Sequence, residues 1–403
     1  MRKIKIAQVA YRSEWALAKF FDALALGTIQ DRFELIAVCG VEKTKEEAIV
    51  KLRDEIINRV RLVAKTGFRV DQRIDEIQSS LRLLDQLVSK LEYHHVNNDP
   101  LLIDNFFASD FEAVVVHSRN INHLTYIEGG MKSGKHVLCE KPLIPVLNQR
   151  GKPYADDIRE LEEIVRNAPP HCILMDSEHY SYKPASLIFY ENFPNILGGK
   201  KIKRVEGELA EIDDPGFGRT KDILSQENCT GLMGDTLCHL LAFISNLGAK
   251  PVPVKRKHGN YSGYGVDTYD EVGFEVRDCP DYFTNDAIAQ FRVVKFIDLM
   301  QTPEQDEKKY IKFILDDGTE IRLDFRDGEV TRTSNETSQP VAFRYIPYKN
   351  EYVNILNTLY ESIINGTHPR TTFSHSLATL NAIHKAYCLP SGNNLHEEMY
   401  KPK

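Results

Sequence analysis

The 403-residue sequence lacks a long apolar run, an excess of basic residues and a paired cysteine motif. A membrane helix needs about 18 consecutive apolar residues, and a nucleic-acid surface needs clustered lysine and arginine, whereas the net charge here is −7. The seven cysteines are scattered without a C-x-x-C pair, which is typical of free thiols in a reducing compartment. No signal-peptide pattern precedes the first strand-like segment. We expect a cytoplasmic protein that binds neither nucleic acid nor membranes.

The short motifs of several enzyme classes are also absent. The sequence has no Gly-x-Ser-x-Gly elbow of a serine hydrolase and no P-loop. The neighbours Cys238–His239 and His94–His95 lack the spacing of zinc ligands. We therefore expect neither a hydrolase of that type nor a metal site.

The first part of the chain alternates apolar strands with helices. Its strand-like runs lie at residues 4–9, 33–41, 111–118 and 136–142. Helical patterns lie between them at 14–24 and 123–132. Strands this apolar indicate a parallel sheet that is covered on both faces. The sequence thus predicts an α/β domain over residues 1–142.

After Pro142 the pattern changes to alternating polar and apolar residues, which indicates an antiparallel sheet. The alternating segments lie at 202–213, 271–276, 287–297, 309–315 and 319–325. Helices are expected at 156–166, 351–364 and 374–387. We therefore predict an α+β domain over residues 143–403, with helices on one face of its sheet.

A charged, strongly helical insertion interrupts the first domain at about residues 43–100. Apolar residues recur three and four positions apart in two sets, which predicts an amphipathic helical hairpin. The sets are Ile49, Leu52, Ile56, Val60 and Val63, and then Ile74, Ile77, Leu81, Leu84, Leu87, Val88 and Leu91. Two interpretations remain open. The hairpin either packs on its own domain as a solvated insertion, or it caps the site or contacts another subunit or protein partner.

A lysine directly follows the last predicted strand of the first domain. Lys141, in HVLCEKP, lies at the carboxyl edge where open α/β sheets bind ligands, and Pro142 fixes its backbone. A lone lysine there is more often a solvated surface residue, so its position alone leaves its role open. The surrounding segment GKHVLCEKPL resembles the signature of the glucose–fructose oxidoreductase and inositol dehydrogenase family, called Gfo/Idh/MocA.

This resemblance implies a Rossmann domain with a parallel sheet, followed by an α+β domain with an open, mainly antiparallel sheet. It implies hydride transfer between NAD(P) and the hydroxyl or carbonyl of a sugar-like or cyclitol-like small molecule. It also implies a homo-oligomer assembled through the C-terminal sheet. The family's Thr-Pro-Asn…His loop corresponds to a segment here in which Ser118-Arg119 replaces Thr-Pro. Cofactor contacts are then expected from Ser118, Asn120, His123, Glu140 and Lys141.

Asp235 and His239 form a second constellation, in CTGLMGDTLCHLLAF. Four residues apart on a helix, they share one face, and a carboxylate beside an imidazole suits general acid–base chemistry. On spacing alone, such a pair is more often a plain structural contact. By the resemblance it corresponds to the family's catalytic Asp-x-x-x-His pair, with Lys141 as third member. His239 would exchange a proton with the substrate hydroxyl, and Lys141 would polarise the oxygen.

Substrate contacts are expected from HYSYKPA, where relatives place an aromatic or basic residue before a proline. Tyr180, Tyr182 and Lys183 are the candidates, although tyrosines at a strand exit serve packing equally well. Arg219 follows the loop DDPGFGR and is a further candidate for an anionic group. A solvated loop explains Arg219 equally well.

The turn after the first strand, VAYRSEW, contains no glycine. The three glycine positions of a Rossmann turn fall on Ala10, Arg12 and Trp15. If a cofactor binds, we expect contacts from Ala10, Arg12 and Ser13, with Arg12 pairing the phosphates by charge. The carboxylate expected at the end of the second strand is replaced by Gly40, with Glu42 two residues on, which favours NADP over NAD.

Three functions remain open on this evidence. Our prediction is an NAD(P)-dependent oxidoreductase. The first alternative is a non-redox enzyme that uses Lys141, Asp235 and His239 for proton transfer or elimination. The second is a non-catalytic partner subunit or binding module, which contacts a protein through the 43–100 insertion. Retention of the trio weighs against the second alternative, because a structural role does not need it.

Overall fold

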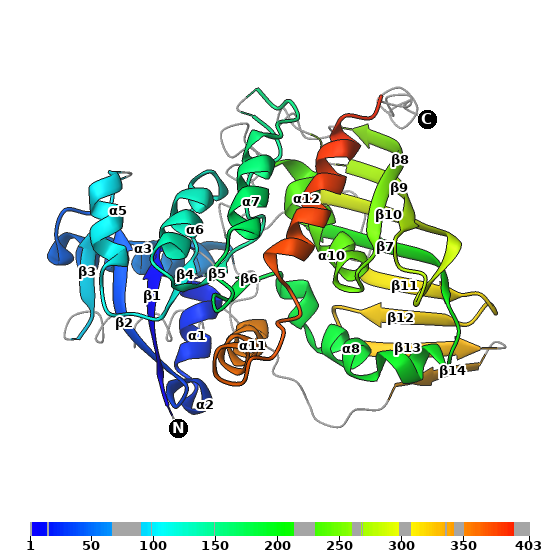
Figure 1. Cartoon of the computed structure of the whole chain (residues 1–403), viewed down its shortest axis with the longest axis horizontal. Coiled ribbons are helices and arrows are strands. Elements are labelled where there is room, and N and C mark those ends of the chain that lie inside the picture. The colour runs from blue at the N-terminus through cyan, green and yellow to red at the C-terminus, as the bar shows by residue number, and fades with distance from the viewer. Residues whose placement is uncertain are drawn as a thin grey trace.

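The structure is a computed structural model that describes residues 2–13, 16–66, 90–97, 99–148, 150–212, 230–259, 267, 269–297, 308–334, 337–341 and 350–390. Two sheets, each with its own helices, lie side by side (Figure 1). Within the described ranges, every helix is too short or too polar to cross a membrane.

The first domain is built on a six-stranded parallel sheet. Its order is β3-β2-β1-β4-β5-β6, the doubly wound order of Rossmann domains. Alternate residues of β4 enter two different cores: Val114 and Val116 face one, and Ala113 and Val115 face the other. This explains the unbroken apolar run. The strands are β1 (Ile4–Val9), β2 (Phe33–Gly40), β3 (Glu92–His95), β4 (Ala113–Val116), β5 (His136–Cys139) and β6 (Leu174–Asp176).

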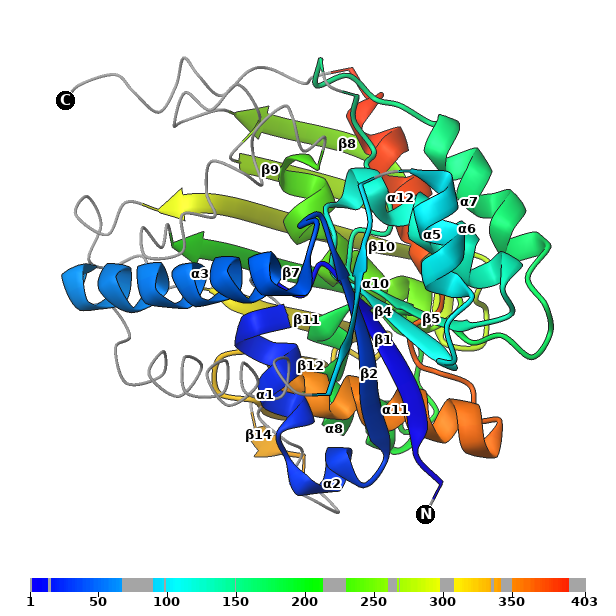
Figure 2. The ribbon, with the colours of Figure 1, turned by 90° about the vertical axis from the view of Figure 1, so that its left-hand side faces the viewer.

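Helices cover both faces of this sheet (Figure 2). The helices α5 (Pro100–Phe107) and α6 (His123–Lys132) pack on one face, followed by α7 (Asp156–Arg166) towards the second domain. The opposite face is covered by α1 (Phe21–Leu24) and by α11 (Glu351–Asn365); α2 (Gly27–Gln30) contacts both of these helices. The predicted α/β class is confirmed.

The helix α11 comes from the end of the chain and yet belongs to the first core. Tyr352, Ile355, Leu356 and Leu359 are fully buried in the same cluster as Ile4 of β1. The boundary predicted at residue 142 therefore does not separate the two cores cleanly, because a segment from residues 143–403 completes the first one.

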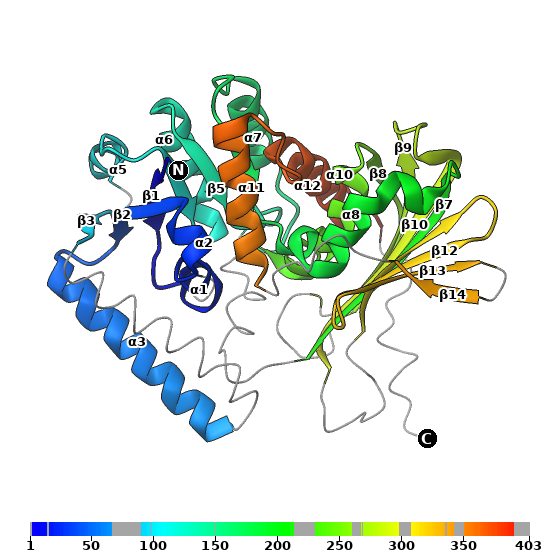
Figure 3. The same cartoon turned by 90° about the horizontal axis from the view of Figure 1, so that it is seen from below.

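The insertion is helical at its start and extended at its end. The first predicted helix is present as α3 (Lys45–Thr66), which runs along the outer edge of the first domain (Figure 3). Residues 92–95 form the edge strand β3 rather than the helical continuation expected to about residue 100. Four residues are too few for strand alternation to stand out in a sequence. The second predicted helix falls mostly outside the described residues.

The second domain contains an eight-stranded sheet in the order β14-β13-β12-β11-β7-β10-β9-β8. β7 and β10 pair in parallel, and the other neighbours pair antiparallel, which confirms the mainly antiparallel sheet. The strands are β7 (Ile202–Ile212), β8 (Lys250–Gly259), β9 (Tyr269–Arg277), β10 (Phe283–Ile297), β11 (Lys309–Leu315), β12 (Glu320–Asp324), β13 (Glu329–Ser334) and β14 (Thr337–Pro340).

One face of the second sheet is covered by α8 (Pro184–Leu197), α10 (Cys238–Asn246) and α12 (Phe373–Tyr387). The described residues leave the other face open, and that face carries charged side chains. Lys312 lies 3.1 Å from Glu206, and Arg292 lies 3.5 Å from Glu208. The sheet therefore has one apolar and one polar face.

Candidate active site

A cleft of about 420 Å³ opens at the carboxyl ends of β1, β2 and β4. This is the edge at which doubly wound sheets bind ligands. The predicted cofactor contacts that line it are Ala10, Arg12, Ser13, Glu42 and Ser118. A cleft therefore exists where the sequence predicts a dinucleotide site.

The turn after β1 keeps the backbone of a glycine turn without the glycine. Ala10 has a φ of 57°, in the left-handed region that costs a non-glycine residue about 1–2 kcal/mol. Ser13 N–H closes the turn on the Ala10 carbonyl at 2.9 Å, and Ser13 Oγ accepts from Ala16 N–H. The expected helix over 14–24 begins here as a π-helix (Ala16–Phe20) and continues as α1. Trp15 lies outside the described residues.

Arg12 and Glu42 form an ion pair inside the cleft. The Arg12 side chain is 30% exposed, whereas that of Glu42 is 6% exposed. The hydroxyls of Tyr11 and Tyr93 lie 3.4 and 3.3 Å from Glu42 Oε2. Gly40 leaves room for this cluster, because a Cβ there would lie 2.8 Å from the Tyr11 ring. Protein groups thus surround the Glu42 carboxylate, and the Arg12 guanidinium is the charge presented to the cleft.

Asn120 and His123 are buried beside the cleft and hold loops together. Asn120 Nδ2 donates a hydrogen bond of 2.8 Å to Thr230 in the second domain. The His123 ring lies between the carbonyls of Ser118, at 2.8 Å, and Pro142, at 3.1 Å. His123 thereby fixes the segment that carries Lys141 relative to the cleft.

Glu140 belongs to a buried hydrogen-bonded chain that reaches α11. Gln8 Nε2 donates to His117 Nδ1 at 3.2 Å, His117 Nε2 donates to the Tyr352 hydroxyl at 3.0 Å, and that hydroxyl donates to Glu140 at 2.5 Å. Burial lowers the pKa of His117 to about 3, so the ring is neutral and Nε2 carries its single proton. The chain anchors α11 directly beside Lys141.

Lys141, Asp235 and Lys295 form a buried ionic cluster between the domains. Lys141 Nζ lies 2.7 Å from the Asp235 carbonyl and 3.1 Å from Asp235 Oδ1, and Lys295 of β10 pairs with Oδ2. All three residues are less than 9% exposed. Asp235 lies in a π-helical turn (Met233–Leu237), a distortion that is frequent at functional sites. The structure brings Lys141 and Asp235 together and adds Lys295 to them.

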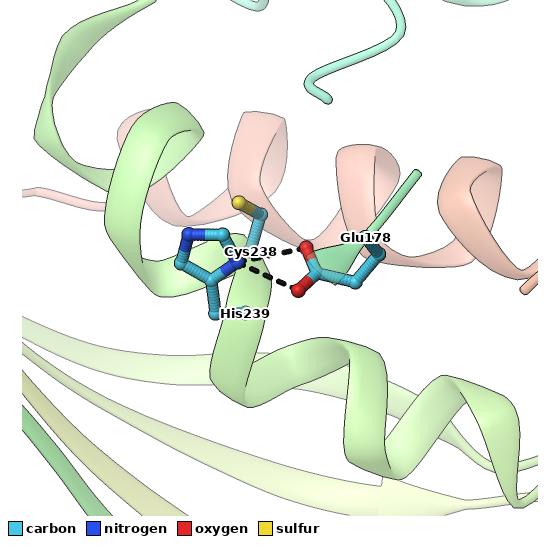
Figure 4. Close-up of side chains that lie close together, drawn as sticks. All are labelled: Glu178, Cys238 and His239. Carbon is cyan, nitrogen blue, oxygen red and sulfur yellow. Dashed lines mark hydrogen bonds and ion pairs between the residues drawn. The ribbon is translucent and has the colours of Figure 1, made fainter. Parts of the chain in front are cut away.

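His239 is held by Glu178, a residue that the sequence analysis did not single out. His239 Nδ1 lies 2.7 and 2.8 Å from the two carboxylate oxygens of Glu178, and the second ring nitrogen points away from them (Figure 4). The Tyr180 ring stacks on the imidazole with its centroid 4.3 Å away. Glu178 therefore takes the orienting position that was expected for Asp235, whose carboxylate binds the two lysines.

Glu178, Cys238 and His239 also form a set of potential metal ligands among the described residues. Their ligand atoms lie within 4.8 Å of one another (Figure 4). Zinc–ligand bonds of about 2.0–2.3 Å hold tetrahedral ligands more than ~3 Å apart. His239 and Glu178 are closer than that, so their arrangement is a direct hydrogen-bonded pair.

A second carboxylate, Asp176, lies close to Glu178. Both line a small cavity of about 20 Å³, together with Lys141 and with His375 and Ser376 of α12. Burial raises the pKa of Asp176 to about 7 and that of Glu178 to about 8; the Glu140 carboxylate adds to both shifts, and Asp176 adds to that of Glu178. This side of the site therefore binds a proton near neutral pH.

The predicted substrate residues take different places. Tyr180 contacts His239, and Lys183 Nζ lies 3.8 Å from the Tyr180 ring centroid. Tyr182 is fully buried in the first core and its hydroxyl lies 3.0 Å from Thr371, which favours a packing role. Arg219 lies outside the described residues.

Sequence reasoning missed Asp176, Glu178 and Lys295 for two different reasons. Asp176 and Glu178 end the apolar run of β6, so two acids at a parallel strand end were a readable signal. Lys295 is one lysine in an alternating strand of the second domain. Nothing in that pattern distinguishes it from a solvated residue.

The cleft offers part of what a nicotinamide dinucleotide requires. Arg12 supplies a cation for phosphate oxygens, and the Ala10–Ser13 turn supplies the close backbone of a glycine turn. Glu42 is the carboxylate that could bind ribose hydroxyls, but Arg12, Tyr11 and Tyr93 surround it and make it less accessible. These residues fit the phosphate groups of a dinucleotide better than its ribose hydroxyls.

Comparisons with known proteins agree with this architecture. Curated protein sequences give no match to the chain. Among solved structures, UDP-N-acetylglucosamine 3-dehydrogenase from Acidithiobacillus ferrooxidans superposes with a TM-score of 0.65 at 14% identity, over 96% of this chain and 98% of that one. A 3-ketoreductase from Actinomadura kijaniata, solved with NADP and TDP-benzene, gives 0.62 at 13%, over 96% and 97%. Levoglucosan dehydrogenase, solved with NADH and levoglucosan, gives 0.65 at 12%, over 96% and 98%.

At these identities, the structural matches establish the fold. The family evidence comes from residues 21–169, which match the model of the oxidoreductase family with an NAD-binding Rossmann fold. The predicted resemblance to the Gfo/Idh/MocA oxidoreductase family is thereby confirmed over residues 21–169, and the two-domain fold is the one found in the solved structures above.

Proposed function

We propose that the protein is an NAD(P)-dependent oxidoreductase that interconverts a hydroxyl and a carbonyl group of a sugar-like or cyclitol-like molecule. One observation carries this proposal: Lys141 and Asp235, 94 residues apart, meet in a buried cluster beside the dinucleotide cleft. His239 lies about one helical turn beyond Asp235. The nucleotide-linked and anhydro sugars named for the structural neighbours support the substrate class.

Each residue has a defined task in this proposal. His239 exchanges a proton with the substrate oxygen through the nitrogen that points away from Glu178. The Lys141 ammonium stabilises negative charge on that oxygen, and Asp235 keeps Lys141 in place. When bound, the dinucleotide supplies the acceptor or donor of the hydride. Tyr180 and Lys183 are the described residues that we place nearest the substrate.

The proposal is tested by titrating the purified protein with NADPH and with NADH, followed by calorimetry or by nucleotide fluorescence. We expect binding of at least one of them at micromolar concentration. No heat and no fluorescence change with either nucleotide at millimolar concentration would remove the redox function and leave the non-redox alternative.

The second prediction concerns the choice between the two cofactors. Because Arg12 faces the cleft and covers Glu42, we propose that the protein prefers NADPH. Replacing Arg12 by alanine removes a charge-assisted hydrogen bond worth about 1.5–3 kcal/mol, so NADPH affinity is expected to fall roughly ten- to a hundredfold. NADH affinity should stay constant or rise, since Glu42 becomes accessible.

Lys19 on the neighbouring helical turn offers a matched control, because Lys19→Ala removes a charge without removing an ion pair to Glu42. Its NADPH affinity should remain close to that of the unchanged protein. An equal loss of NADPH and NADH affinity in Arg12→Ala would contradict a role in phosphate selection.

One observation favours a second candidate function. The Arg12–Glu42 pair and the two tyrosines fill the position that the adenosine ribose takes in a Rossmann domain. If this cluster stays closed, the cleft takes no dinucleotide, and Lys141, Asp235 and His239 catalyse proton transfer or elimination on a similar substrate. The nucleotide titration separates the two functions.

We further propose a homo-oligomer in which a second copy covers the polar face of the eight-stranded sheet. Ion pairs such as Lys312–Glu206 on that face can exchange partners across a symmetric interface. A protein partner at the 43–100 insertion and a cytoplasmic location remain predictions from the sequence. Sedimentation at two salt concentrations tests the oligomer.

A further inference from the structure

Two buried carboxylates lie behind His239, on the side away from the proposed substrate position. Glu178 binds His239 Nδ1 through both oxygens, at 2.7 and 2.8 Å. Asp176, two residues earlier, takes no part in this hydrogen bond. It lines the small cavity of about 20 Å³ that Glu178 also lines. Both residues are at least 95% buried, and no hydrogen bond from a described residue reaches Asp176 Oδ1. A buried unpaired carboxylate oxygen is costly unless a proton or a water compensates it.

The charges around this cavity do not balance without an added proton. Asp176 and Glu178 line one cavity with Lys141, and Glu140 raises the pKa of both carboxyl groups. Asp235 is bound by Lys141 and Lys295, so four carboxylates are matched by three cations when His239 is protonated. Like charges that line one buried cavity titrate as a coupled pair, in which one group keeps a proton to a higher pH than an isolated carboxyl group would.

The cavity connects the pair with α12. Its volume of about 20 Å³ suffices for one water molecule, which needs about 10–15 Å³ and two to four polar partners. Ser376 of α12 donates a hydrogen bond to Asp176 Oδ2, and the half-buried His375 lines the same wall. A chain of groups that exchange protons therefore leads from His239 towards the surface of α12.

We propose that Asp176 and Glu178 share one proton and form the internal reservoir through which His239 gains and loses its proton during the reaction. This inference rests on the proposed function. In the oxidation direction, the substrate O–H bond breaks and its proton moves to His239 Nε2, while the carbinol C–H bond breaks and a bound dinucleotide would accept the hydride. The Nδ1 proton passes to Glu178, and Asp176 releases one proton towards the cavity water and His375. Reduction runs these steps in reverse. Glu178 and Asp176 are thus positioning residues for His239.

The reservoir has a consequence for stability that does not depend on catalysis. Both carboxylates have a pKa in the folded protein above their ordinary values, so the folded state holds a proton that the unfolded state has lost between about pH 4 and pH 8. Their contribution to stability is therefore largest at low pH and is lost as the pH rises through about 7 to 8. Asp176→Asn removes the contribution of Asp176 to this dependence, because an amide does not titrate, and leaves that of Glu178.

The experiment measures urea unfolding midpoints of the unchanged protein, Asp176→Asn and the control Asp157→Asn from pH 5 to pH 8. Asp157 is a half-buried aspartate on α7 whose pKa is also raised, but it lies outside the cavity. We expect the urea midpoint of Asp176→Asn to rise above that of the unchanged protein as the pH increases. The midpoint of Asp157→Asn should differ less from that of the unchanged protein. If the urea midpoints of Asp176→Asn and of the unchanged protein change with pH in parallel, the proposal of a shared proton is overturned.

Infrared spectroscopy of the unchanged protein covers the case in which Asp176→Asn fails to fold. A carboxylic-acid carbonyl band should persist at pH 6 and disappear above pH 8; its absence at pH 6 overturns the reservoir. If the protein proves to be an oxidoreductase, Glu178→Gln and Asp176→Asn should also shift the pH profile of kcat, which a structural defect alone would leave in place. If no redox activity is found, the unfolding and infrared results still decide the reservoir.

Discussion

Replacing His239 by glutamine is expected to lower kcat by roughly 10²–10⁴-fold while substrate binding changes little. Glutamine preserves a hydrogen-bonding group of similar reach towards Glu178, but it cannot exchange a proton near neutral pH. The loss should therefore appear in kcat rather than in KM. Steady-state kinetics in both reaction directions, with a nucleotide sugar or an anhydro sugar as substrate, provide the measurement.

The control for this variant is His384→Gln on α12, which replaces a partly buried histidine outside the site. It should retain the kcat of the unchanged protein. If His239→Gln turned over at more than about a tenth of the original rate, His239 would not be the acid–base group. Lys141 would then be the remaining candidate for the proton transfer.

Gly231→Ala is expected to destabilise the protein by about 2–4 kcal/mol, combining left-handed backbone strain with overpacking. Gly231 has a φ of +62° just before the helical turn that carries Asp235. A Cβ there would overlap the Tyr387 hydroxyl and lie 2.9 Å from Leu147 Cδ1. Thermal or urea unfolding measures the loss of stability.

Gly248→Ala separates the two causes. Gly248 has a φ of +81°, but no described atom lies within 4 Å of the position of its Cβ. Its alanine variant should lose only the backbone contribution, about 1–2 kcal/mol. If both variants lose the same free energy of unfolding, Tyr387 and Leu147 move aside without a measurable energetic penalty.

The sequence sufficed for the two sheets because their patterns are local. The apolar run of β4 and the alternation of β7 each reflect which faces are buried, so periodicity carries the information. Short or polar segments carried less information about their secondary structure. β3 is a four-residue edge strand, and its sequence EYHH has no apolar alternation to report.

Site residues could be predicted where they belong to a sequence motif. Residues that only tertiary structure brings to the site could not. Lys141 and His239 stand in recognisable segments of the sequence, and both are buried in the structure. The residues that bind His239 and Asp235 were not suggested by spacing, because Glu178 follows β6 and Lys295 lies in β10. Only tertiary packing brings these side chains to His239 and Asp235.

The position of α11 has a consequence for biosynthesis. Its apolar side fills the core over β1, but residues 351–365 are translated long after β1. The first domain therefore stays open on one face until residues 351–365 have been translated. Domains generally fold as units from the N-terminus, so the nascent protein should expose apolar surface for much of its synthesis. Its yield in cells should accordingly depend on chaperone supply more strongly than the stability of the finished protein would suggest.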